Sequence, residues 1–376
     1  MFQNTKRLLD YAESIGIPAA EVKIYHKGSE IFSERRGYFD DEKKIPLGEG
    51  ALYNIYSCSK FITCTAALML LEKGKFSLDA DVAEYLPAFG DMMVKKNGGI
   101  FKAERRMKVH QLFTMTSGMN YDCASEEVKR GILETEGKAP TVEMTKYLAK
   151  IPLEFEPGET WRYSLSHDVI GALVEVVSGV RFGEFVKANI FDPLGMKDST
   201  YLLPESEHSR VCAHYRYNSA EKKYEDVGKR VQIYRFGEEY ESGGAGISCT
   251  VGDYMRFLEA MRCHKLISEE MTALMSKNHL TEKQGETCWA SEGYGYGLGV
   301  RAPKTGSKRT DYGWGGAAGA FAAVDPVNDI TLYYSQHVLV SPFAPLRKDY
   351  IEAAKLDLGF EAFEEDMFNF KGKTLA

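Results

Sequence analysis

The sequence predicts an α/β fold of the α+β type, in which both ends of the chain build one antiparallel sheet and a mostly helical segment is inserted between them. Three observations predict this arrangement. Runs with β-strand character occur within the first 35 residues and again beyond residue 293, whereas residues 57–190 have mainly the apolar spacing of helices. The composition, with 44% hydrophobic and 27% charged residues, is that of a globular chain with a large core. Strands from the two ends can share one sheet if the intervening helices pack beside it.

The first 50 residues predict a helix followed by a β-hairpin. Residues 5–14 have helical spacing, and two β-like runs follow at residues 20–25 and 30–35. The tetrapeptide His26-Lys27-Gly28-Ser29 separates the two runs as a turn. We therefore expect these runs to pair as a hairpin.

A buried amphipathic helix is predicted to begin at or near Ser57. Apolar side chains follow at intervals of three and four residues, at Phe61, Cys64, Leu68 and Leu71. Gly74 stands where the end of a helix favours glycine. Further helices are expected at residues 109–115, 141–149, 166–177 and 182–189.

The C-terminal part is predicted to return to β-structure. Two helices are expected after the candidate caps Thr250 and Ser268. A last helix is expected at residues 344–355. Strands are expected at residues 211–217, 224–227, 294–301, 319–324 and 330–335.

Together these elements predict two domains. Residues 1–60 plus 235–376 are expected to form the α/β sheet domain, and residues 61–234 the mostly helical domain. We expect the functional site in the groove at their junction.

Charge and hydropathy exclude several kinds of partner. The chain carries 47 Lys and Arg against 54 Asp and Glu, and the net charge of −7 disfavours nucleic acid. The longest apolar stretch, residues 62–71, is about half of the ~20 residues that a bilayer span requires, so no membrane partner is predicted. The N-terminal residues lack the apolar core of a secretory signal, which predicts a cytoplasmic protein. The oligomeric state stays open.

Neither a metal nor an organic cofactor is predicted. The eight histidines are scattered without HExxH or HxH spacing, and the seven cysteines include no CxxC pair. We expect these cysteines to be reduced thiols, because their number is odd and their spacing matches no metal site. The sequence also lacks a GxSxG elbow and a Walker loop.

One short motif has the residue types for nucleophilic catalysis. Ser57-Cys58-Ser59-Lys60 is an S-x-x-K at the start of the predicted helix, where positions i and i+3 share a face. A hydroxyl and an amine placed in this way can share a hydrogen bond, and the amine can serve as a base. The alternative is that Ser57 only caps the helix. A second literal match, Ser219 to Lys222, lies in a polar turn and is rejected for that reason.

Six stretches between residues 20 and 340, one of which contains this motif, resemble conserved stretches of a known superfamily. They are residues 56–61 and 78–87, Leu112-Phe113-Thr114-Met115-Thr116-Ser117-Gly118-Met119, residues 156–164, Phe191-Asp192-Pro193-Leu194-Gly195-Met196, and Ser242-Gly243-Gly244-Ala245-Gly246-Ile247. In this order they resemble the serine β-lactamase-like superfamily, which comprises class C β-lactamases, DD-peptidases and S-x-x-K esterases. The resemblance implies a β-lactamase/transpeptidase-like fold.

The resemblance also implies roles for individual residues. Ser57 would be the nucleophile, Lys60 its partner, and Tyr163 of Tyr163-Ser164-Leu165 the general base and proton donor. Leu165 replaces an asparagine that holds the side-chain amide of β-lactams, which disfavours β-lactam substrates. Ser166 or His167 could offer a substitute hydrogen bond, although packing is the simpler role for His167.

The third catalytic element is expected on an edge strand. In the superfamily this element is usually Lys-Thr-Gly. The sequence contains Lys304-Thr305-Gly306, but its surroundings predict a turn. We therefore place the element at Trp314-Gly315-Gly316, which precedes the strand at residues 319–324. The backbone N–H groups of Ser57 and Ala317 would form the oxyanion hole. Tryptophan in place of a cation would remove a carboxylate anchor and supply an apolar wall, as in the esterases of the superfamily.

The sequence therefore predicts a serine hydrolase that works through an acyl-enzyme on a small-molecule ester or amide. A carboxylesterase on small acyl esters is preferred. A β-lactamase or D-amino-acid peptidase is the first alternative, and a non-catalytic scaffold of the same fold is the second. Tyr121, Tyr234 and Phe236 are candidates for lining the groove.

Overall fold

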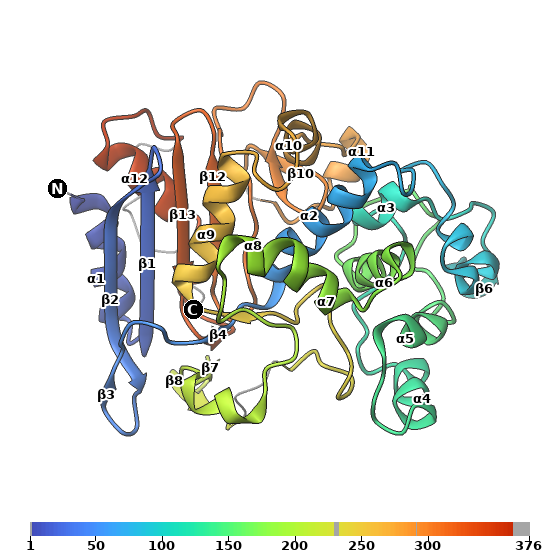
Figure 1. Ribbon diagram of the computed structural model, residues 1–376, viewed down its shortest axis with the longest axis horizontal. Helices are drawn as coiled ribbons and strands as arrows, with labels where there is room; N and C mark the ends of the chain where they lie inside the picture. Colours follow the sequence, from blue (N-terminus) through green and yellow to red (C-terminus); the bar gives the residue numbers. More distant parts are fainter. Residues whose placement is uncertain (1, 229–232, 291, 364–376) are drawn as a thin grey trace.

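A computed structural model describes residues 2–228, 233–290 and 292–363. Its centre is a five-stranded antiparallel sheet that joins both ends of the chain, in the order β12-β13-β1-β2-β3 (Figure 1). The N-terminal hairpin pairs directly with the C-terminal one, because Glu21 lies opposite Ser335. The predicted fold class is confirmed. The strands are β1 (Ala19–His26), β2 (Ser29–Asp40), β3 (Ile45–Pro46), β12 (Phe321–Asp325) and β13 (Ile330–Ser335).

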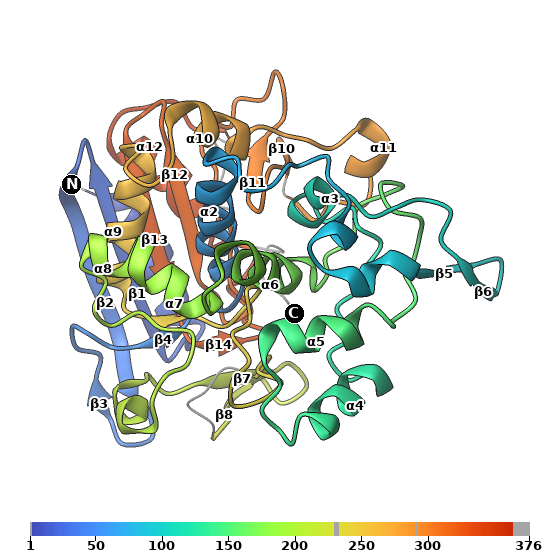
Figure 2. The same cartoon turned by 45° about the vertical axis from the view of Figure 1, so that its right-hand side comes forward.

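The sheet buries both of its faces against helices (Figure 2). On one face, side chains such as Val22 and Leu332 pack with α1 (Gln3–Ser14) and α12 (Asp349–Asp357). On the other face, Tyr333 stacks on Tyr254 of α9 (Val251–Arg262) with ring centroids 4.2 Å apart. Successive side chains of β13 therefore point to opposite faces of the sheet and pack in different hydrophobic cores, because side chains alternate along a strand.

The helix predicted near Ser57 is α2 (Ser59–Glu72), which lies beside α9. Phe61 of α2 contacts Phe257 of α9 edge-on, with ring centroids 5.0 Å apart. The helix begins two residues later than Ser57, because Tyr56–Cys58 form a short 3₁₀ turn ahead of it. Gly74 follows its end with a positive φ of 66°, as predicted.

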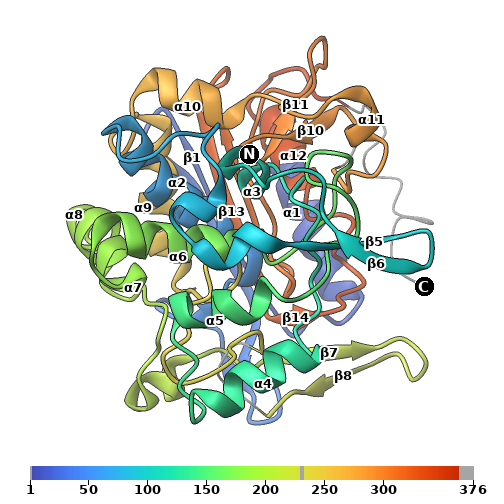
Figure 3. The ribbon, with the colours of Figure 1, turned by 90° about the vertical axis from the view of Figure 1, so that its right-hand side faces the viewer.

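The middle of the chain forms a helical layer beside the sheet (Figure 3). The four predicted helices are present, and the fourth, α7, continues into a π-helical turn, Lys187–Phe191. The structure adds α4, a nine-residue helix capped by Ser125, which was not predicted; it contains a central glycine and buries only Val128 and Gly131. The helices are α3 (Val109–Phe113), α4 (Glu126–Glu134), α5 (Thr141–Leu148), α6 (Ser166–Ser178), α7 (Phe182–Val186) and α8 (Asp192–Leu194).

The C-terminal helices and strands match the prediction in part. Thr250 and Ser268 cap α9 and α10, each accepting a backbone N–H at 3.1 Å. The single strand predicted at residues 294–301 is wrong: a turn closed by Gly297 N–H and the Val300 carbonyl splits it into a hairpin. The remaining elements are β4 (Tyr53–Asn54), β5 (Met93–Lys96), β6 (Gly99–Lys102), β7 (Tyr215–Asn218), β8 (Lys223–Asp226), β9 (Ser248–Cys249), β10 (Tyr294–Tyr296), β11 (Arg301–Pro303), β14 (Val338–Leu339), α10 (Glu269–Ser276) and α11 (Glu282–Gly285).

Two predicted boundaries shift for local reasons. The last helix begins at Asp349 rather than at residue 344, because hydrogen-bonded turns at Ala344 and Leu346 precede it. The strand predicted at residues 211–217 is confined to β7, and the residues before it form isolated contacts. The division of the chain at residues 60/61 and 234/235 stays a prediction.

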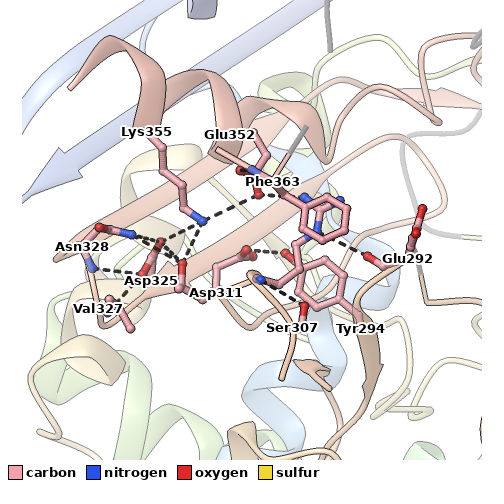
Figure 4. A network of polar contacts seen from close by, with 12 residues as sticks. Glu292, Tyr294, Ser307, Asp311, Asp325, Val327, Asn328, Glu352, Lys355 and Phe363 are labelled. Carbon is pink, nitrogen blue, oxygen red and sulfur yellow. Dashed lines mark hydrogen bonds and ion pairs between the residues drawn. The ribbon is translucent and has the colours of Figure 1, made fainter. Parts of the chain in front are cut away.

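A buried ion network ties α12 to the strands beside the sheet (Figure 4). Arg309 pairs with Glu352 of α12 at 2.7 Å, and Lys355 of α12 pairs with Asp325 of β12 at 3.3 Å. Asp311 accepts from both Arg301 and Tyr294. Because buried charges are costly unless they are paired, this network holds the C-terminal helix in one position. In the described part of the chain, no helix has the length and hydropathy of a membrane span.

Candidate active site

Most predicted site residues meet in one cleft of about 640 Å³. Ser57, Tyr163, Trp314 and Ala317 all line it, although they come from three separate parts of the chain. A second cavity, of about 480 Å³, lies near Gly183 and contains none of them. The cleft that contains Ser57 is therefore the candidate active site.

Ser57 and Lys60 are brought into contact by the turn that begins α2. Lys60 Nζ lies 3.3 Å from Ser57 Oγ and donates to the Gly244 carbonyl at 2.7 Å. The Lys60 side chain is fully buried, and Ser57 is 9% exposed, as a nucleophile that must meet substrate requires. Tyr56, directly before the serine, has a left-handed φ of 48°, an uncommon conformation for a tyrosine.

Gly244 allows the lysine to be held in this way. A Cβ at this position would lie 3.2 Å from Lys60 Nζ and 2.5 Å from Asp168 Oδ2. Asp168 is buried, and its Oδ1 accepts hydrogen bonds from Tyr240 at 2.9 Å and Ser242 at 2.6 Å. Burial raises the pKa of Asp168, and these hydrogen bonds together with the Lys60 charge oppose that effect. Sequence analysis did not find Asp168, because its partners are more than 70 residues away.

Tyr163 lies over the lysine, just ahead of α6. Lys60 Nζ is 4.6 Å from the centroid of its ring. The indole N–H of Trp314 donates to the Tyr163 phenol oxygen at 3.2 Å. Tyr121 stacks on the Tyr163 ring at 5.5 Å, and Trp289, which is 69% exposed, packs on the same ring at 4.9 Å. The phenol is thus fixed by aromatic neighbours beside the lysine amine.

The segment Trp314-Gly315-Gly316 runs along the edge of β12. Gly315 bridges to Phe321, and Gly316 N–H donates to the Ala320 carbonyl at 2.8 Å. A Cβ on Gly316 would lie 2.3 Å from the Ile55 carbonyl oxygen, so only glycine permits this approach to the serine turn. Lys304-Thr305-Gly306 forms an exposed turn outside the cleft.

Two backbone N–H groups are free where the oxyanion hole is expected. Within the described residues, neither the N–H of Ser57 nor that of Ala317 donates to a protein acceptor. Both residues line the cleft. Unpaired backbone donors at a concave site can bind a developing negative charge.

The substitute hydrogen bond considered at Ser166 or His167 is wrong. Ser166 Oγ shares hydrogen bonds of 2.7 Å with both Ser117 and Ser164 and does not line the cleft. His167 Nε2 donates to the Phe113 carbonyl at 3.2 Å, and burial together with the Lys60 charge lowers the pKa of this histidine to about 3. Both side chains therefore serve packing.

Two of the three aromatic residues predicted to line the groove do so. Tyr121 and Tyr234 line the cleft, whereas Phe236 packs on Tyr240 outside it, with ring centroids 4.4 Å apart. Within the described residues, none of the seven cysteines forms a disulfide. In residues 2–228, 233–290 and 292–363, no group of three or more His, Cys, Asp or Glu side chains could hold a metal ion.

Sequence analysis missed the cations of the cleft. Trp314 removes the cation of the third motif, but Arg301, Arg347 and Lys348 from other segments contribute to the cleft wall. Arg301 is engaged with Asp311. Arg347 Nη1 donates to the Gly316 carbonyl at 2.5 Å. No local pattern points to these residues, because each reaches the cleft through the tertiary fold.

Comparison with known proteins places this geometry in a family. The model of the family described as Beta-lactamase matches residues 5–355. Esterase EstB of Burkholderia gladioli is 29% identical over 328 residues, which cover 80% of this chain and 81% of EstB. A putative D-alanyl-D-alanine carboxypeptidase of Escherichia coli is 25% identical and matches 91% of this chain and 83% of its own length.

Solved structures show the same fold. The structure of EstCE1, described as a hydrolase with promiscuous acyltransferase activity, superposes with a TM-score of 0.76 at 23% identity. The superposition covers 93% of this chain and 99% of that one. A penicillin-binding protein homologue from Pyrococcus abyssi superposes with a TM-score of 0.74 at 21% identity, over 96% of this chain and 77% of that one. The protein therefore belongs to the Beta-lactamase family and is a serine hydrolase of that family.

Proposed function

We propose that this protein is a carboxylesterase that hydrolyses small acyl esters through an acyl-enzyme on Ser57. The observation that carries the proposal is the contact between Lys60 Nζ and Ser57 Oγ at 3.3 Å, in a cleft that Tyr163 and Trp314 also line. Six aromatic side chains contribute to the cleft wall, which suits a neutral, apolar ester. The similarity to a protein named esterase supports the same reading.

In the proposed acylation, Ser57 Oγ attacks the ester carbonyl carbon. Its proton passes to the base formed by Tyr163 and Lys60, and the carbonyl electron pair moves to the oxygen. The N–H groups of Ser57 and Ala317 would bind that oxyanion. When the tetrahedral intermediate collapses, the ester C–O bond breaks and the leaving alcohol takes the proton from Tyr163. Water then attacks the acyl-enzyme by the same route, releasing the acid and restoring the serine.

Hydrolysis of p-nitrophenyl butyrate tests the proposal. Wild type, Ser57→Ala and Ser219→Ala are purified in parallel, the last as a matched control in the rejected S-x-x-K of the β7–β8 turn. We expect turnover by wild type and Ser219→Ala and its loss in Ser57→Ala. Equal turnover by all three proteins, or none by wild type, would contradict the proposal.

A β-lactamase or D-amino-acid peptidase is the second candidate. Two observations favour it: the similarity to a putative D-alanyl-D-alanine carboxypeptidase, and the cations Arg347 and Lys348 in the cleft wall. Carboxylate-bearing substrates can bind beside such cations. Hydrolysis of nitrocefin faster than of p-nitrophenyl butyrate would favour this candidate over the esterase.

A further inference from the structure

Arg347 is a cation in the cleft wall without a carboxylate partner. Its Nη1 donates to the carbonyl oxygen of Gly316 at 2.5 Å. Among the described residues, no carboxylate lies within ion-pair distance of its guanidinium. Burial lowers the pKa of Arg347 below the usual arginine value. Arg347 is only partly buried, but an unpaired charge is costly even there, so its contact with a single backbone carbonyl calls for an explanation.

Arg301, the other arginine of the cleft wall, differs from Arg347 because it has a carboxylate partner. Arg301 lines the same cleft, but it pairs with Asp311 and donates to the Ala322 carbonyl at 3.0 Å, within the network that fixes α12. Arg347 takes no part in that network, and its one hydrogen bond goes to the segment that carries the candidate oxyanion hole.

The bonded carbonyl belongs to the peptide that supplies an oxyanion donor. The C=O of Gly316 and the N–H of Ala317 are the two ends of one planar trans peptide, so they point in opposite directions. When Arg347 holds the carbonyl on one side, the N–H is directed to the other side. Ala317 lines the cleft together with Ser57, and its N–H has no acceptor within the described protein.

A second donor reinforces this carbonyl. Gly319 N–H donates to the Gly316 carbonyl at 3.0 Å, closing a turn around Ala317. Hydrogen bonds to a carbonyl polarise its peptide and strengthen the N–H at the other end, and a charged donor does so more than a neutral one. The guanidinium would therefore act on both the direction and the strength of the Ala317 donor.

Gly315 permits this contact. A Cβ on Gly315 would lie 2.9 Å from both Cζ and Nη2 of Arg347, so the guanidinium rests against the bare backbone. The two glycines of Trp314-Gly315-Gly316 thus have separate roles. Gly315 leaves space for the guanidinium of Arg347, and Gly316 leaves space for the Ile55 carbonyl oxygen of the serine turn.

We propose that Arg347 is a positioning residue that orients and polarises the Gly316–Ala317 peptide, so that the Ala317 N–H is a strong oxyanion donor. This inference rests on the proposed acyl transfer at Ser57. Within the described residues, Arg347 donates no hydrogen bond to Ser57 or Tyr163, although its charge acts on the Tyr163 phenol at longer range.

Arg347→Ala and Arg347→Lys test the proposal, with Lys304→Met as the control that removes a cation of an exposed turn outside the cleft. Rates with p-nitrophenyl butyrate are expressed per active Ser57, titrated with a fluorophosphonate, so that a misfolded fraction does not count. We expect kcat of Arg347→Ala to fall by about 10- to 100-fold, somewhat less than for complete loss of an oxyanion donor, with KM nearly unchanged. The kcat of Arg347→Lys should lie between those of wild type and Arg347→Ala, and the kcat of Lys304→Met should stay near wild type.

Chemical rescue separates positioning from a merely structural role. Millimolar guanidinium should restore part of the kcat of Arg347→Ala, whereas ammonium at equal ionic strength should not, because only guanidinium reproduces the planar donor. An unchanged kcat per active site, or no rescue by guanidinium, would overturn the proposal. A rise in KM confined to a carboxylate-bearing ester such as p-nitrophenyl hemisuccinate would also overturn it, in favour of an anion subsite. If wild type shows no Ser57-dependent turnover, the proposed function fails instead.

Discussion

The indole N–H of Trp314 donates to the phenol oxygen of Tyr163 at 3.2 Å, across 151 residues of sequence. The same phenol ring faces the Lys60 ammonium at 4.6 Å. A hydrogen bond of this kind is strongest when the accepting oxygen carries negative charge. Trp314 is therefore more than the apolar wall that the sequence predicts, because it also holds the candidate general base.

Removal of this one N–H should reduce the rate of the chemical step. Trp314→Phe retains an aromatic ring against Tyr163 but cannot donate to its oxygen. We expect kcat for p-nitrophenyl butyrate to fall by about 10-fold, with a smaller change in KM. Steady-state kinetics of this variant beside Trp314→Ala checks the prediction, since loss of the whole ring should raise KM as well. A Trp314→Phe enzyme with wild-type kcat would show that the hydrogen bond is dispensable.

The approach of Gly316 to the serine turn should not tolerate a methyl group. In Gly316→Ala, the new Cβ would lie 2.3 Å from the Ile55 carbonyl, so either the edge segment or the turn must move. We expect a loss of about 1–3 kcal/mol in the free energy of unfolding and a fall in kcat of at least tenfold. Gly285→Ala is the control, because nothing lies within 4 Å of its Cβ. Urea denaturation and ester hydrolysis of both variants provide the comparison.

Buried His167 should make the protein sensitive to acid. Its folded-state pKa, lowered to about 3, lies below its ordinary value of 6.5, so between these values the unfolded chain binds a proton that the folded protein does not. Stability is therefore full above pH 6.5 and falls with pH towards 3, by about 2 kcal/mol at pH 5. His167→Gln removes this titration.

Urea denaturation at pH 7 and pH 5 measures this contribution. The difference in the free energy of unfolding between the two pH values should shrink in His167→Gln by about the same 2 kcal/mol. An equal difference in wild type and variant would mean that His167 is protonated in the folded protein as readily as in the unfolded chain.

The sequence was sufficient for features that depend on local pattern. The helix after Ser57 follows from its apolar spacing and from Gly74, and the 3₁₀ turn ahead of it brings Ser57 into contact with Lys60. The caps Thr250 and Ser268 are local as well. The strand that follows Trp314-Gly315-Gly316 was enough to predict that this segment, rather than Lys304-Thr305-Gly306, runs beside β12 and lines the cleft.

The features that sequence analysis missed depend on contacts between distant segments. Arg347 reaches Gly316 across 31 residues, and Asp168 reaches Tyr240 and Ser242 across more than 70. The division of the strand predicted at residues 294–301 depends on a turn at Gly297 that apolar periodicity does not reveal. Such contacts depend on how the sheet packs against its helices, so no short sequence motif predicts them.

The central claim is that Ser57 carries the acyl group, and covalent trapping tests it most directly. The protein is treated with a fluorophosphonate, with and without excess p-nitrophenyl butyrate, then digested, and the labelled peptide is identified by mass spectrometry. We predict one label per chain, on Ser57, slowed by the ester and absent from Ser57→Ala. A label on another residue, or ester hydrolysis that persists in Ser57→Ala, would contradict the account.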